Sequence, residues 1–382
     1  MTTAAPILNR STATQQSLAH GPLGVALLHI ERAHRGAGSW QAVHCRLGAI
    51  GPLIDGNKAN LFLGAPAMAY VLHLASAGTN RYGNALHTLD GIIAAHTRRR
   101  LGAAHARIDQ GKQTSFAEYD LLRGLTGLGA LLLRRDPGSN TAKAVLEYLV
   151  RLTEPLHSPG GRTLPGWWVW HGPATPGVPT PGGHANVGLA HGIAGPLALL
   201  ALAKLRGISV TGHHEAMTRI CRWLDQIRQS DYRGARWPRW ITETAAVPTH
   251  PAAPSWCYGT PGLARAQQLA AMALGDACRQ RMAEQALLSC LADPLQLDQL
   301  AGRGLCHGIG GLLRVVQRVA EDAEEPGVFA TYAPQLSGRF RTAESPAEIG
   351  FLEGSTGAAL AFEVTGTDTA PATNWDSCLL LA

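Results

Sequence analysis

The sequence is poor in charge and has almost no lysine. Only 16% of its 382 residues are charged and 46% are hydrophobic, a balance typical of a globular protein with a large buried core. The net charge of +6 comes from arginine, since lysine occurs only at Lys58, Lys112, Lys143 and Lys204. No dense basic run with interleaved aromatics is present, so nucleic-acid binding is not expected. The basic surface could attract an acidic peptide, but an arginine-biased composition with no particular partner explains it equally well.

Long apolar runs and export signals are also missing. The longest apolar candidate, 195–205, is far shorter than the roughly 18 residues that a membrane span needs. Residues 1–16 are polar and lack the plan of a signal peptide, so we expect a flexible N-terminus there. The seven cysteines are an odd number and indicate reduced thiols plus metal ligands rather than a disulfide framework. We therefore expect a cytoplasmic protein with no membrane span.

Glycine, in contrast, is abundant and recurs in one pattern. A glycine turn followed by a small, apolar stretch occurs seven times, with spacings of 43, 60, 68, 67, 49 and 46 residues between first glycines. A period in this range predicts a repeat architecture whose units cannot bury their apolar faces alone. The seven turns begin at Gly21, Gly64, Gly124, Gly192, Gly259, Gly308 and Gly354.

Each unit is predicted to be a helical hairpin. Glycine permits a tight turn, positive φ and close backbone approach, and the run of small apolar residues after it suits a tightly packed helix. Amphipathic candidates for outer helices lie between the turns, at 141–152, 214–227 and 277–291. Seven hairpins can stack as an open solenoid or close into a ring. We favour an all-α fold in which residues 17–382 form one α/α toroid, with seven inner helices inside seven outer ones and all seven turns at one end.

One segment departs from the hairpin plan. Residues 157–183 are rich in proline, glycine and tryptophan, which predicts an irregular insertion of extended loop. Its three tryptophans could cap a central cavity or grip a peptide. Aromatic filling of an irregular insertion is an equally good interpretation.

Three of the glycine turns carry potential metal and proton-transfer groups. Cys257 precedes the turn at Gly259, Cys306 and His307 precede Gly308, and His191 precedes Gly192. Two cysteines and one histidine supply three zinc-type ligands, one fewer than a closed structural site needs, which is typical of catalytic zinc with an open position. Neighbouring turns of a closed ring would bring these side chains together. The alternative is free thiols at packed turns; the other five cysteines are interpreted as inert core residues.

The motifs WCYG-x-PG at 256–262, CHG-x-GG at 306–311 and AHG-x-AG at 190–195 resemble those of the lanthionine synthetase C (LanC) family of peptide cyclases. The resemblance covers nearly the whole chain, including the turn after Asp120 and the final turn beginning at Phe351. It implies an α/α toroid with one Zn²⁺ held by Cys257, Cys306 and His307. It also implies addition of cysteine thiols to dehydroalanine or dehydrobutyrine, giving lanthionine or methyllanthionine thioether rings, as in antibiotic biosynthesis.

The ligand set agrees with thiol chemistry. A free thiol has a pKa near ~8.5, whereas a metal-bound thiol is deprotonated outright. Two cysteine ligands would leave the site with excess negative charge when a substrate thiolate joins them, so the attacking sulfur stays electron-rich. Three neutral histidines would withdraw more electron density from it.

Addition to a dehydroamino acid creates an enolate that must be stabilised and then protonated. His191 is the leading general acid, and also a candidate base for the thiol proton; its alternative is a core histidine. Asp120 could orient or charge-stabilise His191, or simply cap a helix N-terminus. Tyr258 could hydrogen-bond the enolate or a substrate carbonyl, while Trp256 is expected to shape the wall of the substrate pocket.

One position departs from the family pattern. Family members commonly carry an arginine four positions before the zinc cysteine, where this chain has Ala253. Arg236 and Arg239 are possible substitutes for the missing cation.

The expected partner is a dehydrated precursor peptide with its leader and core. Dehydration would come from a separate enzyme, since no kinase, lyase or nucleotide-binding stretch such as GxxxxGK[ST] is present. A zinc hydrolase is a weaker alternative, because thiolate ligands lower the Lewis acidity of the metal. A non-catalytic zinc toroid that binds glutathione or peptide thiols as a scaffold or sensor is the other alternative, and it would need neither His191 nor Asp120.

Overall fold

The computed structural model describes residues 10–157, 161, 163–172, 179–243, 253–365 and 371–382. Residues 1–9, and with them most of the expected flexible N-terminus, lie outside the described residues. Within the described chain, a helix starts one or two residues after the first glycine of every repeat, as the glycine pattern predicts. These seven inner helices are α2 (Pro22–His34), α4 (Ala65–Ser76), α7 (Leu125–Arg135), α9 (Ala194–Leu205), α11 (Thr260–Leu274), α14 (Ile309–Glu321) and α17 (Ser355–Thr365).

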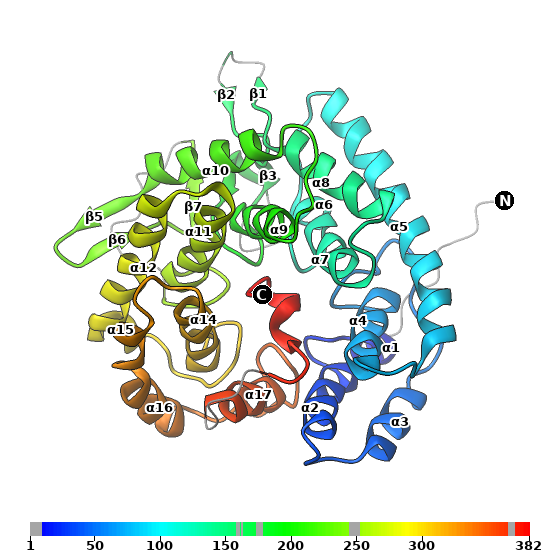
Figure 1. Cartoon of the computed structure of the whole chain (residues 1–382). Helices are drawn as coiled ribbons and strands as arrows, with labels where there is room; N and C mark the ends of the chain where they lie inside the picture. The colour runs from blue at the N-terminus through cyan, green and yellow to red at the C-terminus, as the bar shows by residue number, and fades with distance from the viewer. Residues whose placement is uncertain (1–9, 158–160, 162, 173–178, 244–252, 366–370) are drawn as a thin grey trace.

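The inner helices close on one another. Each contacts the next in chain order, and α17 contacts α2, so the first and last units of the chain lie side by side (Figure 1). Their small side chains allow this: every residue of α9 from Ala194 to Ala203 is buried, as expected for a helix that is apolar all round.

A second set of helices covers the outside of this ring (Figure 1). These helices bury one face only; in α10 the buried residues recur every three or four positions, from His213 to Leu224. The outer helices are α3 (Trp40–Gly48), α5 (Gly83–Asp109), α8 (Asn140–Leu152), α10 (His213–Ile227), α12 (Ala277–Ala292), α15 (Pro326–Ala330) and α16 (Ala333–Thr342). Short helices complete the described chain: α1 (Arg10–Gln15), α6 (Phe116–Tyr119), α13 (Pro294–Leu297) and the 3₁₀ helix η1 (Trp375–Leu379).

Close backbone approach, more than positive φ, explains the repeat glycines. Of the seven first glycines only Gly64 has positive φ, at 75°. The second glycine of the motif packs on the carbonyl six residues earlier: a Cβ on Gly311 would lie 1.9 Å from Leu305 O. No side chain fits there, so the sequence must keep glycine where the turn meets its helix.

The chain is mostly helical, but the all-α expectation is wrong in two segments. The insertion at 157–183, expected as loop, supplies four strands, and three more follow α10. Extended backbone is favoured there because proline interrupts helices and buried and exposed residues alternate, as at Val169 and Trp170. The strands are β1 (Leu156–His157), β2 (Thr163–Leu164), β3 (Val169–His171), β4 (Pro179–Asn186), β5 (Gln229–Asp231), β6 (Gly234–Arg236) and β7 (Trp240–Thr242).

The strands form three small antiparallel sheets. β1 pairs with β2 and β5 with β6, while β3, β4 and β7 form a three-stranded sheet with β4 in the middle. β4 ends at Asn186, four residues before the Ala190-His191-Gly192 turn. The three-stranded sheet therefore braces that turn.

The end of the chain differs from the expectation of one outer helix for each inner helix. Two outer helices, α15 and α16, follow α14, whereas the described residues after α17 form none. Instead, 371–382 run into the middle of the ring (Figure 1). Tyr70 on α4 donates to Trp375 O at 2.7 Å, and the Arg265 guanidinium on α11 donates to Leu381 O at 2.8 Å. Polar groups on the inner helices thus hold this C-terminal segment in place.

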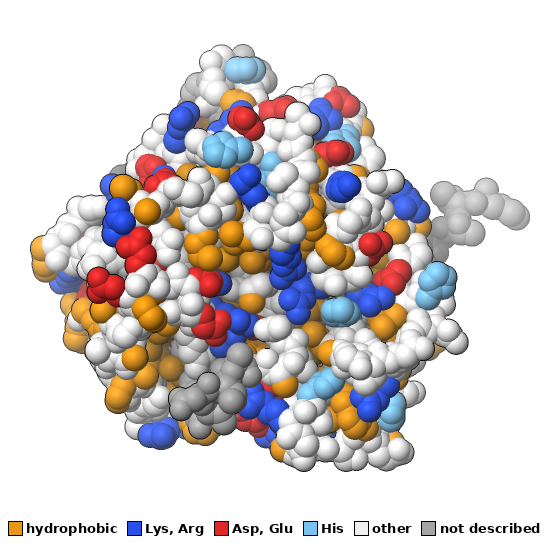
Figure 2. All heavy atoms as spheres, viewed as in Figure 1, with side chains coloured by type: hydrophobic (Ala, Val, Ile, Leu, Met, Phe, Trp, Pro, Cys, Tyr) orange, Lys and Arg blue, Asp and Glu red, His pale blue; other side chains and the backbone are white. Residues whose placement is uncertain are grey.

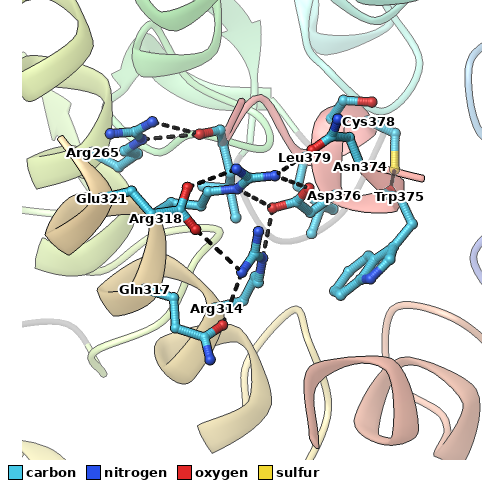
Figure 3. Close-up of polar contacts among 12 residues, drawn as sticks. Arg265, Arg314, Gln317, Arg318, Glu321, Asn374, Trp375, Asp376, Cys378 and Leu379 are labelled. Carbon is cyan, nitrogen blue, oxygen red and sulfur yellow. Dashed lines mark hydrogen bonds and ion pairs between the residues drawn. The ribbon is translucent and has the colours of Figure 1, made fainter. Parts of the chain in front are cut away.

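An ion-pair cluster anchors the C-terminal segment to α14. Asp376 is fully buried and accepts from Arg314 and Arg318 at 2.7 Å each (Figure 3). Arg318 also donates to Asn374 Oδ1 at 3.0 Å. Side chains fill the middle of the ring in the face that Figure 2 shows, and basic side chains gather there.

No helix among the described residues is long and apolar enough to cross a membrane.

Candidate active site

Backbone hydrogen bonds join the turns that carry the candidate site residues. Leu189 N donates to Cys257 O at 2.9 Å, and Leu121 N donates to Ala190 O at 3.1 Å. The turns bearing Asp120, His191 and Cys257 are therefore neighbours. In the same way Leu305 N donates to Leu352 O at 2.7 Å, which sets the Cys306 turn against the last glycine turn.

Cys257, Cys306 and His307 come together as one cluster. Their possible ligand atoms all lie within 4.8 Å of one another. Both cysteines are buried, whereas the His307 side chain is 58% exposed. The cluster therefore combines a protected sulfur pair with one side open to solvent.

Glu353 orients the histidine of this cluster. Its carboxylate lies in hydrogen-bonding contact with His307 Nδ1, which leaves Nε2 available to face the sulfurs. A carboxylate behind a ligating histidine is the usual outer partner in metal sites, because it fixes the tautomer and raises ligand basicity. Glu353 was missed from the sequence, although it stands immediately before Gly354, as His307 stands before Gly308.

The electrostatics of the cluster favour a thiolate. Hydrogen bonds from the Cys306 thiol and from His307 lower the pKa of Cys257 to about 5, although burial acts in the opposite direction. The neighbouring Cys257 raises the pKa of Cys306. Contact with Cys257 and Glu353 raises the pKa of His307 to about 10. Thiolate is the form of cysteine that binds metals, and two sulfurs with one imidazole fit the donor set that zinc prefers.

His191 and Asp120 form a second group. His191 Nδ1 lies 2.7 Å from Asp120 Oδ2; the aspartate is fully buried and the histidine side chain is 23% exposed. Asp120 Oδ1 accepts from Arg123 N at 2.6 Å and Gly124 N at 2.9 Å. One carboxylate oxygen thus secures the start of α7 and the other holds the imidazole, so the two interpretations of Asp120 are compatible.

Tyr258 lies beside His191, with 6.0 Å between the ring centroids. Burial raises the pKa of Tyr258, and the nearby Arg239 and Asn186 side chains partly oppose that shift. Phe116 also packs against His191, with 5.5 Å between the ring centroids. Two aromatic rings therefore pack against the half-buried imidazole.

Trp256, which was expected to shape the wall of the substrate pocket, lies in the interior of the protein. It is fully buried, and its indole Nε1 donates to Leu379 O of the C-terminal segment at 3.0 Å. It packs behind the Cys257 turn, where it supports the turn from the interior of the ring.

Arg236 and Arg239, the two possible substitutes for the arginine that is missing at Ala253, have different partners. Arg236 pairs with Asp231 on the β5–β6 hairpin. The Arg239 guanidinium lies over the Tyr258 ring, 3.8 Å from its centroid. Only Arg239 is thus shown in contact with a candidate site residue.

Known proteins resemble this chain in sequence and in fold. The sequence matches the family described as "Lanthionine synthetase C-like protein" over residues 12–380. Nisin biosynthesis protein NisC of Lactococcus lactis subsp. lactis is 24% identical over 270 residues, which span 67% of this chain and 61% of that protein. The match thus covers less than two thirds of that relative's length. A solved structure of nisin cyclase superimposes with a TM-score of 0.78 at 20% identity, covering 96% of this chain and 92% of the other, so the two share a fold.

Proposed function

This chain belongs to the lanthionine synthetase C-like family, and on that premise we propose that it is a zinc-dependent cyclase on an α/α toroid that closes thioether rings in a dehydrated precursor peptide. The observation that carries the proposal is the convergence of Cys257, Cys306 and His307. The relatives named for nisin biosynthesis and nisin cyclisation support the same reaction class.

Cys257, Cys306 and His307 would hold the Zn²⁺. When bound, the metal would supply deprotonation of the incoming cysteine thiol at neutral pH. Three protein ligands leave one position for that thiol. Glu353 fixes the His307 ring, and Trp256 supports the Cys257 turn from behind.

The His191–Asp120 pair carries the proton. The substrate thiolate forms a bond from sulfur to Cβ of the dehydroamino acid, while the Cα–Cβ π bond breaks and its electron pair moves onto the carbonyl oxygen. His191, which has taken up the proton released by the thiol, then delivers it to Cα, and the carbonyl re-forms. The net change transfers the thiol proton to Cα. Asp120 holds Nδ1 and stabilises the imidazolium, so that Nε2 is the atom that carries the mobile proton.

The substrate is a dehydrated ribosomal precursor with leader and core. The cyclisation neither forms nor consumes water, so a preceding dehydration reaction must supply the dehydroamino acids. The seven cysteines are all unpaired, which suits action in the reducing cytoplasm.

The His191→Ala variant tests the proposal. The assay uses a synthetic peptide with dehydroalanine three residues before a cysteine, and iodoacetamide labelling followed by mass spectrometry counts the remaining thiol. We expect zinc-loaded wild-type protein to consume the thiol without a mass change. We expect His191→Ala to retain zinc and to lose roughly 100-fold or more in rate.

The competing function is the zinc toroid that only binds thiols. Equal rates for wild-type and His191→Ala protein would favour that binder and contradict the cyclase. The buried Asp120 behind His191 disfavours it, since thiol binding alone needs no proton-transfer pair.

A further inference from the structure

Two hydrogen-bond donors beside Tyr258 have no task in the mechanism above. They are the amide of Asn186, at the end of β4, and the guanidinium of Arg239, immediately before β7. The sheet holds them next to each other, because Asn186 pairs with Trp240 and Val187 N donates to Arg239 O at 3.1 Å.

The orientation of the Asn186 amide is fixed by its surroundings. Its Oδ1 accepts from Gly188 N at 3.0 Å, so Nδ2 must point the other way. Asn186 is fully buried, and its Nδ2 has no hydrogen-bond partner within the described part of the chain. A buried donor without a partner costs free energy comparable to a lost hydrogen bond, and so indicates a group that a ligand completes.

Arg239 is also available to a ligand. It is exposed and forms no ion pair among the residues that the structure describes, unlike Arg236. Stacking on the Tyr258 ring at 3.8 Å restrains the guanidinium while leaving its in-plane N–H groups free to donate.

Both donors act on the same corner of the site. Arg239 stacks on the Tyr258 ring. Gly188, which donates to Asn186, packs against the same ring, since a Cβ on Gly188 would lie 2.7 Å from Tyr258 Cδ1. Tyr258 in turn neighbours His191. This donor-rich corner lies next to the cysteine of an electron-rich sulfur cluster. Negative charge that leaves the sulfur during addition can therefore be received there.

We propose that Arg239 and Asn186, together with Tyr258, bind the carbonyl oxygen of the dehydroamino acid and stabilise the negative charge that it gains as the enolate. The inference rests on the proposed cyclase function. Donors aimed at a developing oxyanion act mainly in the transition state. They lower the barrier to S–Cβ bond formation, and the proton still goes from His191 to Cα.

Arg239→Gln in the zinc-loaded protein tests the inference, with Arg233→Gln on the exposed β5–β6 hairpin as the matched control. With the synthetic dehydroalanine–cysteine peptide, we expect Arg239→Gln to lower kcat by roughly 100-fold with little change in KM. Arg239→Lys should recover part of that loss, and Arg233→Gln should match wild-type protein. Asn186→Asp, which keeps the acceptor for Gly188 and removes the donors, should also lower kcat.

A second peptide separates a contact to the carbonyl from a structural effect. In it, the carbonyl of the dehydroalanine is a thioamide, a weaker hydrogen-bond acceptor. The thioamide should lower kcat by a smaller factor in Arg239→Gln than in wild-type protein. The reason is that the variant has already lost the hydrogen bond from Arg239 that the thioamide weakens.

The outcomes distinguish this inference from the proposed function. If wild-type protein cyclises the peptide but Arg239→Gln equals Arg233→Gln, only the carbonyl contact is wrong. The carbonyl contact is also wrong if the thioamide lowers kcat by the same factor in Arg239→Gln as in wild-type protein, or if Arg239→Gln changes KM alone. If wild-type protein consumes no thiol, the cyclase itself is contradicted.

Discussion

At the scale of single residues, the two positions before each repeat glycine supply most of the candidate site. Cys257 and Tyr258 precede Gly259, Cys306 and His307 precede Gly308, and His191 precedes Gly192. These positions lie where a turn faces its neighbour, immediately before a helix N-terminus. The residue types there were readable from the sequence. The sequence offered Arg236 and Arg239 together, and only the structure distinguishes them, because no periodic pattern connects a residue beside a strand to a turn.

Glu353 occupies the same position before Gly354, and its contact with His307 leads to a prediction. Glu353→Gln should weaken zinc binding by about 10- to 100-fold, because a ligating histidine loses the carboxylate that fixes its tautomer. Competition with a chromophoric chelator measures the affinity.

Glu344→Gln is the matched control. That glutamate is exposed on the same segment, and its hydrogen bond with Arg303 is made by the backbone carbonyl and not by the carboxylate. Equal zinc affinities for the two variants would remove Glu353 from the metal site.

At the scale of elements, the glycine repeat predicted where the inner helices begin. The second glycine of the motif packs on the backbone carbonyl six residues earlier, as at Gly311, and a side chain there would clash with it. Amphipathic spacing likewise predicted outer helices such as α10. Six of the seven described strands were missed because strands of two or three residues have no periodicity of their own. β4 is eight residues long, but its prolines and glycines favoured a loop, and its partner β7 is far away in sequence. The position of 371–382 depended on Arg265, Arg314 and Tyr70, whose inward direction only the closed ring determines.

The close approach at Gly311 can be tested by adding a single methyl group. Gly311→Ala should lower the free energy of unfolding by about 2–3 kcal/mol, since its Cβ would lie 1.9 Å from Leu305 O and the backbone must shift. Thermal or denaturant unfolding measures the change.

Gly102→Ala in α5 is the control for helix propensity, because no atom lies within 4 Å of its added Cβ. It should be neutral or stabilise the protein by up to about 1 kcal/mol. A Gly311→Ala protein as stable as Gly102→Ala would show that close packing does not explain the repeat glycines.

At the scale of the whole molecule, the C-terminal segment ties several inner helices to one another through the middle of the ring. Burial alone would raise the pKa of Asp376, but Arg314 and Arg318 outweigh it and hold that pKa well below its usual range. The carboxylate therefore stabilises the fold fully above about pH 4, and the contribution is lost as the pH falls toward the lower pKa of the folded state.

Asp376→Asn should destabilise the protein by about 3–5 kcal/mol, because it leaves Arg314 and Arg318 buried without their counter-charge. Its free energy of unfolding should also vary less with pH below about pH 4 than that of wild-type protein. Asp109→Asn, which removes the carboxylate of an exposed pair with Arg151, should change stability by no more than about 0.5 kcal/mol. Identical acid unfolding of wild-type and Asp376→Asn protein would contradict the role of the cluster.

The central claim is that Cys257, Cys306 and His307 hold a zinc ion with a position open to a substrate thiol. Zinc K-edge EXAFS of the purified protein, recorded with and without a cysteine-containing peptide, tests it most directly. We expect two sulfur neighbours in the free protein and three when the peptide is bound. Four protein ligands that do not change on addition of the peptide would indicate a closed structural site and would contradict the cyclase.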